Sequence, residues 1–146
     1  MQVPGLIIAA TRSGSGKTLV TLGLLRALAR RGVNVAGAKV GPDYIDPAFH
    51  GVASGRPACN LDSWAMRATT LTQAVAGAGA GGALVLCEGV MGLYDGIGVE
   101  GVGSTADVAQ ATGWPVVLVL DAGGAATSVA AMLKGFQAFQ PGVRIA

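Results

Sequence analysis

Residues 10–18 read A-T-R-S-G-S-G-K-T, and this segment joins two stretches of regular apolar pattern. The apolar run at residues 6–10 comes before it and is typical of a buried strand. After it, apolar residues recur at helical spacing from residue 17 to residue 31, and Gly32 suits the position after a helix end. Residues 33–40 form a second apolar run. Strand, helix and strand in this order make a βαβ unit, which requires a parallel sheet.

The loop itself has the composition of a phosphate-binding loop. Backbone N–H groups in such a loop bind phosphate oxygens together with the N-terminus of the following helix. The pattern G-x-x-x-x-G-K-[ST] has Thr11 in place of its first glycine, but G-S-G-K-T is intact. The alternative is an ordinary turn with a helix cap, which the flanking strand and helix argue against. We predict a site for a nucleoside triphosphate with Mg²⁺, in which Lys17 contacts the β- and γ-phosphates and the Thr18 hydroxyl binds the metal. The predicted nucleotide-binding residues are Arg12, Ser13, Gly14, Ser15, Gly16, Lys17 and Thr18.

The bulk composition excludes several classes of protein. A chain of 146 residues suits a single domain. Hydrophobic residues make up 51% of it, but the longest clean apolar runs, at residues 83–87 and 116–120, are too short to cross a bilayer, which takes roughly 20 residues. A net charge of +2 is too small to indicate nucleic acid as a partner. We therefore expect a soluble protein with no membrane and no nucleic-acid partner.

Cysteine and histidine give no sign of a metal site. Cys59 and Cys87 lack metal-ligand spacing and any C-x-x-C motif, and Cys87 has the character of a buried core residue. Both thiols fit a reducing cytoplasm. His50 is the only histidine, and one histidine without partners at ligand spacing is poor evidence for a metal site.

The alternation of strand and helix continues along the chain. Long stretches rich in Pro, Gly and Asp at residues 41–62 and 89–103 follow strands and are expected to be functional loops, because ligands bind beyond the carboxyl ends of parallel strands. The predicted fold is α/β, a P-loop NTPase-type parallel sheet flanked by helices. Residues 142–146 look like the start of another strand, so we expect a sheet that is incomplete at the C-terminus and a truncated chain. Further strands are expected at residues 83–88 and 115–121, and further helices at residues 68–76, 104–112 and 125–139.

Charged side chains at the strand ends are the candidate catalytic groups. Lys39 ends the second strand, where it would neutralise a transferring phosphoryl group or simply be a solvated charge. Asp43 and Asp46 follow it beside prolines, either as turn-making residues or with one of them holding metal. Glu88 ends a later strand, where NTPases place a magnesium-associated carboxylate. Asp95 is a further candidate, although it could simply form an Asp-Gly turn, and Asp121 could likewise shape a turn.

Two long motifs carry a family resemblance. Residues 39–50, K-V-G-P-D-Y-I-D-P-A-F-H, and residues 88–96, E-G-V-M-G-L-Y-D-G, closely resemble the cobyrinic acid a,c-diamide synthases. The wider relatives of that family are dethiobiotin synthetase and the chromosome-partitioning ATPases. The resemblance covers essentially the whole chain and extends to Gly103-Ser104-Thr105-Ala106. The substitution at Thr11 is usual in this family.

The resemblance implies an ATP-dependent amidation in cobalamin biosynthesis. ATP would phosphorylate the a and c side-chain carboxylates of cobyrinic or hydrogenobyrinic acid, and ammonia would displace the phosphate. In the family, ammonia comes from glutamine through a C-terminal amidotransferase domain, which residues 1–146 do not resemble, so we expect this piece alone to be inactive. The expected partners are ATP, a corrinoid polycarboxylate and ammonia from the glutaminase domain, with a homodimer left open.

Residue by residue, the resemblance assigns roles to both motifs. The metal positions are Thr18, Asp43 and Glu88, and Lys17 and Lys39 match the phosphate-contacting lysines. The substrate positions are Tyr44, Asp46 and Asp95, and the catalytic positions are Lys39, Asp46 and Asp95. Because a carboxylate is a weak nucleophile, catalysis would come from positioning and charge neutralisation.

Other functions remain open at this point. A ParA-like ATPase switch is one, although such proteins usually carry a second lysine early in the loop, where this chain has only Arg12. Cobyric acid synthase, a paralogue with different motifs, is another. The sequence does not decide between a cobalt-containing corrinoid, a metal-free corrinoid and a nickel porphinoid.

Overall fold

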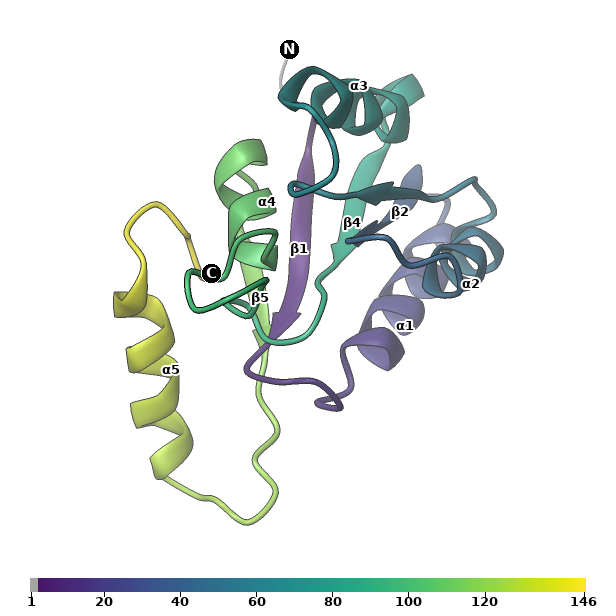
Figure 1. Ribbon diagram of the computed structural model, residues 1–146. Helices are drawn as coiled ribbons and strands as arrows, with labels where there is room; N and C mark the ends of the chain where they lie inside the picture. The colour runs from purple at the N-terminus through teal and green to yellow at the C-terminus, as the bar shows by residue number, and fades with distance from the viewer. Residues whose placement is uncertain (1–2) are drawn as a thin grey trace.

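A central parallel sheet organises the protein. The computed structural model describes residues 3–146, and within them the sheet has five strands in the order β3-β2-β4-β1-β5, all parallel (Figure 1). The predicted α/β class is therefore confirmed. The strands are β1 Gly5–Ala10, β2 Val35–Val40, β3 Cys59–Leu61, β4 Leu84–Glu88 and β5 Val116–Val119.

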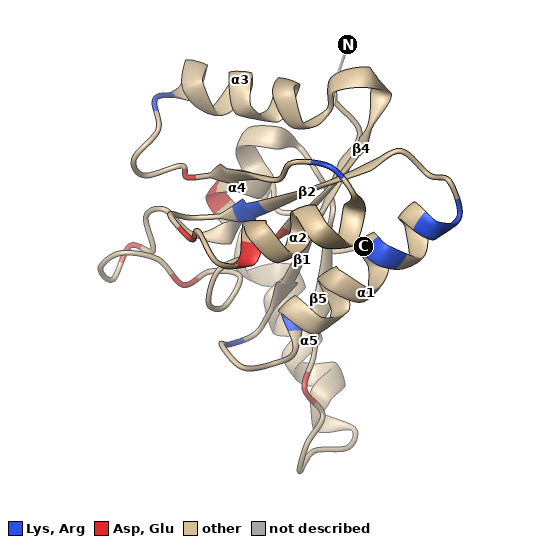
Figure 2. Ribbon diagram, turned by 90° about the vertical axis from the view of Figure 1, so that its right-hand side faces the viewer, with Lys and Arg blue, Asp and Glu red and all other residues tan. Residues whose placement is uncertain are grey.

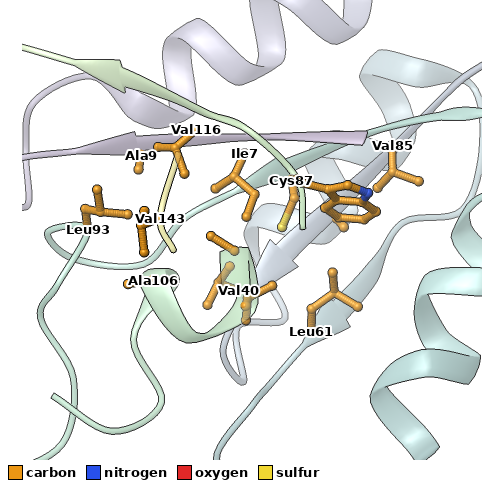
Figure 3. Packing of buried hydrophobic residues seen from close by; sticks show 14 of the residues in the cluster. Ile7, Ala9, Val40, Leu61, Val85, Cys87, Leu93, Ala106, Val116 and Val143 are labelled. Atoms are coloured by element: carbon orange, nitrogen blue, oxygen red, sulfur yellow. The ribbon is translucent and has the colours of Figure 1, made fainter. Parts of the chain in front are cut away.

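Helices cover both faces of the sheet. On one face, α1 and α2 pack on a core that includes Ile8, Leu25 and Leu86. On the other face, α3 and α4 cover a larger core, which Figure 3 shows around Ile7 and Cys87. The burial of both sheet faces explains why the strands read as continuous apolar runs. The helices are α1 Lys17–Arg30, α2 Asp46–Ser54, α3 Ala68–Ala78, α4 Thr105–Thr112 and α5 Ser128–Phe139, with a short 3₁₀ turn at Ala80–Gly82.

The prediction of a long loop at residues 41–62 was wrong. This stretch contains helix α2 and the short strand β3. Proline is favoured in the first helical turn because its missing N–H would have no helical partner there, and Pro47 occupies that place in α2. Gly55 ends the helix in a left-handed conformation, with φ of 74°. Proline and glycine thus delimit a helix here and do not mark a loop.

The predicted strand at residues 142–146 pairs with the sheet. The Val116 N–H donates to the Arg144 carbonyl at 2.8 Å, and the Ala146 N–H donates to the Val116 carbonyl at 2.9 Å. Ile145 forms a parallel bridge with Val116, so this segment lies beside β5 at the edge of the sheet. In the part of the chain that the structure describes, no helix combines the length and the apolar character that a membrane span requires.

Candidate functional site

The phosphate loop lies between β1 and α1 and opens onto a pocket. Gly14 and Gly16 have φ of 76° and 90°, a left-handed conformation that glycine adopts without strain. Among the described residues no side chain caps the start of α1, and its first turn carries no acid. The N–H groups and the positive end of the helix are therefore available to an anion. The pocket has a volume of about 430 Å³ and is lined by Ser13, Gly14, Gly16, Lys17, Thr18, Leu19, Lys39, Glu88, Gly89 and Met91.

Lys17 lies at the wall of this pocket and is largely buried. Its ammonium donates to the Met91 carbonyl at 2.6 Å and to the Arg12 carbonyl at 3.3 Å. Burial lowers the pKa of Lys17, and the nearby charge of Lys39 lowers it further. Carbonyl oxygens only partly compensate a buried ammonium, so Lys17 remains a strong potential partner for an anion.

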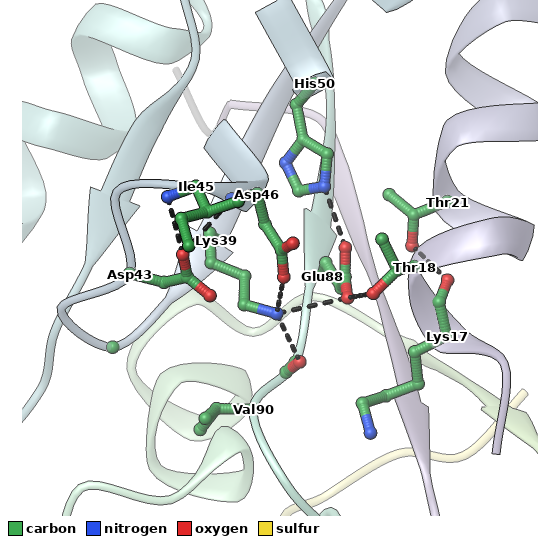
Figure 4. Close-up of polar contacts among 12 residues, drawn as sticks. Lys17, Thr18, Thr21, Lys39, Asp43, Ile45, Asp46, His50, Glu88 and Val90 are labelled. Atoms are coloured by element: carbon green, nitrogen blue, oxygen red, sulfur yellow. Dashed lines mark hydrogen bonds and ion pairs between the residues drawn. The ribbon is translucent and has the colours of Figure 1, made fainter. Parts of the chain in front are cut away.

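Strand register brings Lys39 and Glu88 together. These residues are direct neighbours on β2 and β4, and the Lys39 ammonium lies 3.1 Å from Glu88 Oε1 (Figure 4). The Thr18 hydroxyl donates to the same oxygen at 2.5 Å. The phosphate loop, β2 and β4 thus meet at one carboxylate oxygen, which confirms the expectation that these strand ends form one rim.

The charges of this pair are stabilised by their partners. Burial alone would lower the pKa of Lys39, but the hydrogen bond to Asp46 and the charge of Glu88 raise it. Burial alone would raise the pKa of Glu88, but hydrogen bonds from His50 and Thr18 and the Lys39 charge lower it. Lys39 is therefore an ammonium and Glu88 a carboxylate at neutral pH.

Helix α2 also contacts the Lys39–Glu88 pair. Asp46, in its first turn, lies 2.7 Å from the Lys39 ammonium. Asp43 Oδ1 accepts the N–H groups of Ile45 and Asp46 at 2.8 and 3.1 Å, so Asp43 shapes the turn into the helix. Burial opposes ionisation of Asp43, but these N–H groups and the charge of Lys39 together lower its pKa.

His50 is a site residue that the sequence did not indicate. Its Nε2 lies 2.7 Å from Glu88 Oε2, and the side chain is fully buried (Figure 4). As a candidate metal ligand, His50 lacks partners at ligand spacing, so its sequence context gives it no role. The available signal was its spacing of four residues from Asp46, which places both on one helix face. The expectation of a loop over residues 41–62 conceals that signal.

The structure also places the remaining residues that the sequence predicted for the site. Tyr44 is 85% exposed. Asp95 accepts the Gly92 N–H at 2.9 Å, which closes a turn in the loop after β4. The Arg12 guanidinium pairs with Asp121 at 2.7 Å on the surface, and Ser15 donates to the Arg12 carbonyl at 3.1 Å. Asp121 also accepts the Gly123 N–H, which confirms its turn-shaping role.

Acidic residues are concentrated on the loop side of the sheet. The chain has eight of them, and each lies at the end of a strand, in the loop after it or in the first turn of the next helix. Figure 2 shows this segregation, with a group of basic residues at the far end of α1. Lys17 and Lys39 line the pocket at the same rim, so groups of both signs meet there. The residues are Asp43, Asp46, Asp62, Glu88, Asp95, Glu100, Asp107 and Asp121.

The oxygen donors fit Mg²⁺ bound together with phosphate. Magnesium usually takes one or two carboxylates plus substrate phosphates, and retains water. The Thr18 hydroxyl and Glu88 Oε1, which are hard oxygen ligands, meet within the pocket. Across residues 3–146 no group of three or more His, Cys, Asp or Glu side chains could hold a metal ion, so an all-protein cage is absent there.

Comparison with known proteins agrees with this geometry. The sequence model of the CobQ/CobB/MinD/ParA nucleotide binding domain matches residues 6–146. A hydrogenobyrinate a,c-diamide synthase of Rhodobacter capsulatus is 58% identical over 135 residues, covering 90% of this chain and 31% of the relative. Proteins of the same name from Rhizobium meliloti and Mesorhizobium japonicum are each 51% identical, over 97% and 100% of this chain and over 33% and 34% of their own lengths. The chain thus spans about a third of the length of these relatives.

Proposed function

This chain belongs to the CobQ/CobB/MinD/ParA nucleotide binding domain family, and we propose that it is the ATP-binding core of a hydrogenobyrinate a,c-diamide synthase. The relatives that are 51–58% identical to it carry this name. The observation that carries the proposal is the convergence of Thr18 and Lys39 on Glu88 Oε1, in the pocket that also exposes the phosphate loop. The name of the relatives favours a metal-free corrinoid over a cobalt corrinoid.

The proposed reaction has two steps. An oxygen of a corrinoid side-chain carboxylate attacks the γ-phosphorus of ATP, and the bond to the β–γ bridging oxygen breaks to release ADP. Ammonia then attacks the acyl carbon of the mixed anhydride, loses a proton, and inorganic phosphate leaves with the electron pair of the C–O bond. The carboxylate needs no general base in the first step, because it is already ionised at neutral pH. The protein therefore has to bring two anions together and neutralise the charge between them.

The lysines supply this neutralisation. Lys17 would leave the carbonyls of Met91 and Arg12 and contact the β- and γ-phosphates, since a phosphate is a stronger acceptor for an ammonium than a carbonyl. Lys39 would contact the phosphoryl group in transfer, and its raised pKa keeps it charged for that role. Thr18, Asp43 and Glu88 would hold Mg²⁺, which when bound offsets the charge of the phosphates.

The corrinoid would approach from the side of α2 and the loop after β4. Tyr44 is exposed at the start of this segment and would be free to contact a large planar ligand. Asp46 and Asp95 would order the reacting carboxylate through Lys39 and the backbone of the loop. We propose that ammonia comes from glutamine, through a glutaminase domain beyond the third of the relatives' length that this chain matches.

The test is the ATPase and amidation activity of the protein encoded by the complete reading frame. We expect hydrogenobyrinic acid to stimulate ATP hydrolysis and to gain amides from glutamine or ammonia, as measured by mass spectrometry. Thr18→Ala should raise the Mg²⁺ concentration that is needed for half-maximal rate. Stimulation by DNA without any response to the corrinoid would instead support a partitioning-type ATPase.

A further inference from the structure

His50, a buried residue of α2, contacts Glu88, the carboxylate proposed to bind Mg²⁺. The contact is with the oxygen of Glu88 that Thr18 does not contact. Glu88 uses its two oxygens for different partners: Oε1 accepts from Thr18 and Lys39, and Oε2 lies 2.7 Å from His50 Nε2. Glu88 is 1% exposed and His50 is fully buried, so solvent does not compete for either oxygen. The plane of the carboxylate is therefore set from two sides, and only Oε1 is directed at the phosphate loop.

The sheet is built to admit this imidazole. A Cβ atom on Gly37 of β2 would lie 2.6 Å from the Cβ and 3.2 Å from the Cγ of His50, so a side chain at position 37 would occupy its space. Ser54 donates to the His50 carbonyl at 2.9 Å, one helical turn further along α2. The backbone thus leaves room for one bulky group above the Lys39–Glu88 pair.

Burial of His50 has an energetic cost that packing alone does not explain. Within residues 3–146 its Nδ1 is buried and has no hydrogen-bond partner. An unsatisfied buried nitrogen destabilises the folded state, and an aliphatic side chain of similar size would fill the space without that cost. The contact of Nε2 with Glu88 therefore accounts for a histidine at this position better than core filling does.

We propose that His50 is a positioning residue, which holds Glu88 by Oε2 so that Oε1 faces Thr18 and the magnesium-nucleotide. This inference rests on the proposed metal role of Glu88. Groups that orient a metal ligand in this way typically contribute 10–100-fold in affinity or activity. Asp46 lies one turn earlier on the same helix and holds Lys39, so α2 fixes both charges of the pair. Displacement of α2 would therefore disturb metal and phosphoryl contacts together.

Two substitutions of His50 by amide side chains of different length test whether the donor nitrogen has to reach Glu88. In His50→Gln the amide nitrogen lies near the place of Nε2 and can still donate to Glu88. In His50→Asn the amide nitrogen lies near the place of Nδ1 and falls short. The measurement is the affinity for a non-hydrolysable ATP analogue, by titration calorimetry, in Mg²⁺ and in excess EDTA, on the protein from the complete reading frame. Ser54→Ala is the structural control, since it removes a buried bond of the same helix.

We expect His50→Asn to reduce the Mg²⁺-dependent gain in affinity by on the order of tenfold, with the affinity in EDTA unchanged. His50→Gln should keep most of the gain, and Ser54→Ala should lower the melting temperature without changing the gain. With saturating Mg²⁺ and ATP, His50→Asn should lower kcat more than it raises the KM for the corrinoid. Equal gains in the Gln, Asn and wild-type proteins, or equal losses in Gln and Asn, would overturn the positioning role.

Glu88→Gln separates this inference from the proposed function. If Glu88→Gln loses the Mg²⁺-dependent gain while His50→Asn keeps it, the metal role of Glu88 stands and the role of His50 fails. If Glu88→Gln itself keeps the gain, the metal role in the proposed function fails. Proper folding of each variant is established by its affinity in EDTA, which depends on the phosphate loop.

Discussion

Lys17 and Met91 are 74 residues apart in the sequence, and a hydrogen bond of 2.6 Å joins the lysine ammonium to the methionine carbonyl. Met91 has φ of 47°, the only left-handed conformation of a non-glycine residue among those described. Such a conformation costs on the order of 1–3 kcal/mol and persists only where the surroundings hold it. The phosphate-loop lysine is thus one of the groups that hold the loop after β4, and a nucleotide that attracts Lys17 would loosen that loop.

Replacement of Lys17 should separate activity from stability. Lys17→Met removes the cation for the β- and γ-phosphates, and we expect kcat/KM for ATP to fall by on the order of 100-fold or more. The melting temperature should change little, because the substitution removes the Lys17 contact that holds the loop after β4 but also removes a buried charge that burial disfavours in the folded state. Steady-state kinetics and thermal unfolding measure the two effects. Lys134→Met on the exposed face of α5 is the control and should change neither. A large fall in melting temperature would contradict this account of Lys17.

Asp46 should matter more than its partly exposed position suggests. Asp46→Asn leaves Lys39 with Glu88 as its remaining charged partner, so the pKa of Lys39 should fall. We expect a loss of roughly 1.5–3 kcal/mol in the free energy of unfolding, the range for a hydrogen bond to a charged group. In activity, kcat should fall with little change in the KM for ATP, because Asp46 is outside the nucleotide pocket.

Asp121→Asn is the matched control for Asp46→Asn. It removes the ion pair between Asp121 and Arg12, in which the arginine side chain is 64% exposed and the aspartate side chain is 40% exposed. Exposed pairs contribute about 0–1 kcal/mol, so the unfolding free energy should change by no more than that. Equal effects of the two substitutions in urea unfolding would show that the buried position of Lys39 confers no advantage.

The acid stability of the protein should depend on Glu88. Its partners lower its pKa from the ordinary value of 4.5, so below that value the unfolded chain binds a proton that the folded protein excludes. The free energy of unfolding is therefore fully retained above this range, and falls as the pH drops through the lowered pKa. Glu88→Gln should flatten this acid limb when urea unfolding is measured from about pH 7 to about pH 3. An unaltered limb in Glu88→Gln would refute the assignment.

At high pH, we expect the free energy of unfolding to depend on the charge of Lys39. Its pKa is raised above the ordinary value of 10.5, so its contribution is present below that value and is lost as the pH rises through the raised pKa.

Two glycine substitutions should have opposite effects. Gly37→Ala places a Cβ against His50 and should destabilise the protein by about 1–3 kcal/mol, as overpacking of a core does. Gly23→Ala lies in the middle of α1 with no atom within 4 Å of the new Cβ, and should stabilise by up to about 1 kcal/mol. Urea unfolding of the two variants measures both. A neutral Gly37→Ala would mean that α2 moves easily away from the sheet.

The sequence predicted those parts of the site that depend on local signals. Residues 10–18 could be identified because a glycine-rich loop that ends in Gly-Lys-Thr, between a strand and a helix, is typical of phosphate binding. Lys39 and Glu88 were expected on one rim because the carboxyl ends of parallel strands share an edge, and the register confirms it. The roles assigned to Asp43, Tyr44, Asp46 and Asp95 stay predictions.

His50 was not predicted because its one sequence signal, the four-residue spacing from Asp46, has meaning only once α2 is recognised as a helix, and because its contact with Glu88 is not local. Glu88 lies 38 residues further along, and only the folded sheet brings the two together. Helix α2 was missed for a related reason: Phe49 and Val52 are 57% and 79% exposed, so its apolar residues do not mark the buried face. Asn60 was missed as well, although it donates to the carbonyls of Gly41 and Asp43 and so holds the turn before α2.

The position of β4 between β1 and β2 affects how the protein acquires its site during folding. Thr18 and Glu88 are separated by 70 residues, and β1, the strand before the phosphate loop, pairs only with β4 and β5 among the described strands, so β1 has no sheet neighbour until these later segments of the chain are in place. Contacts between such distant segments must overcome the entropy of closing a long loop, and they tend to form late. A nascent chain that ends before residue 88 contains Lys39 and Thr18 but lacks Glu88, the carboxylate that both side chains contact. Full affinity for a magnesium-nucleotide would then be gained only when the central strand has inserted, as one of the last events of folding.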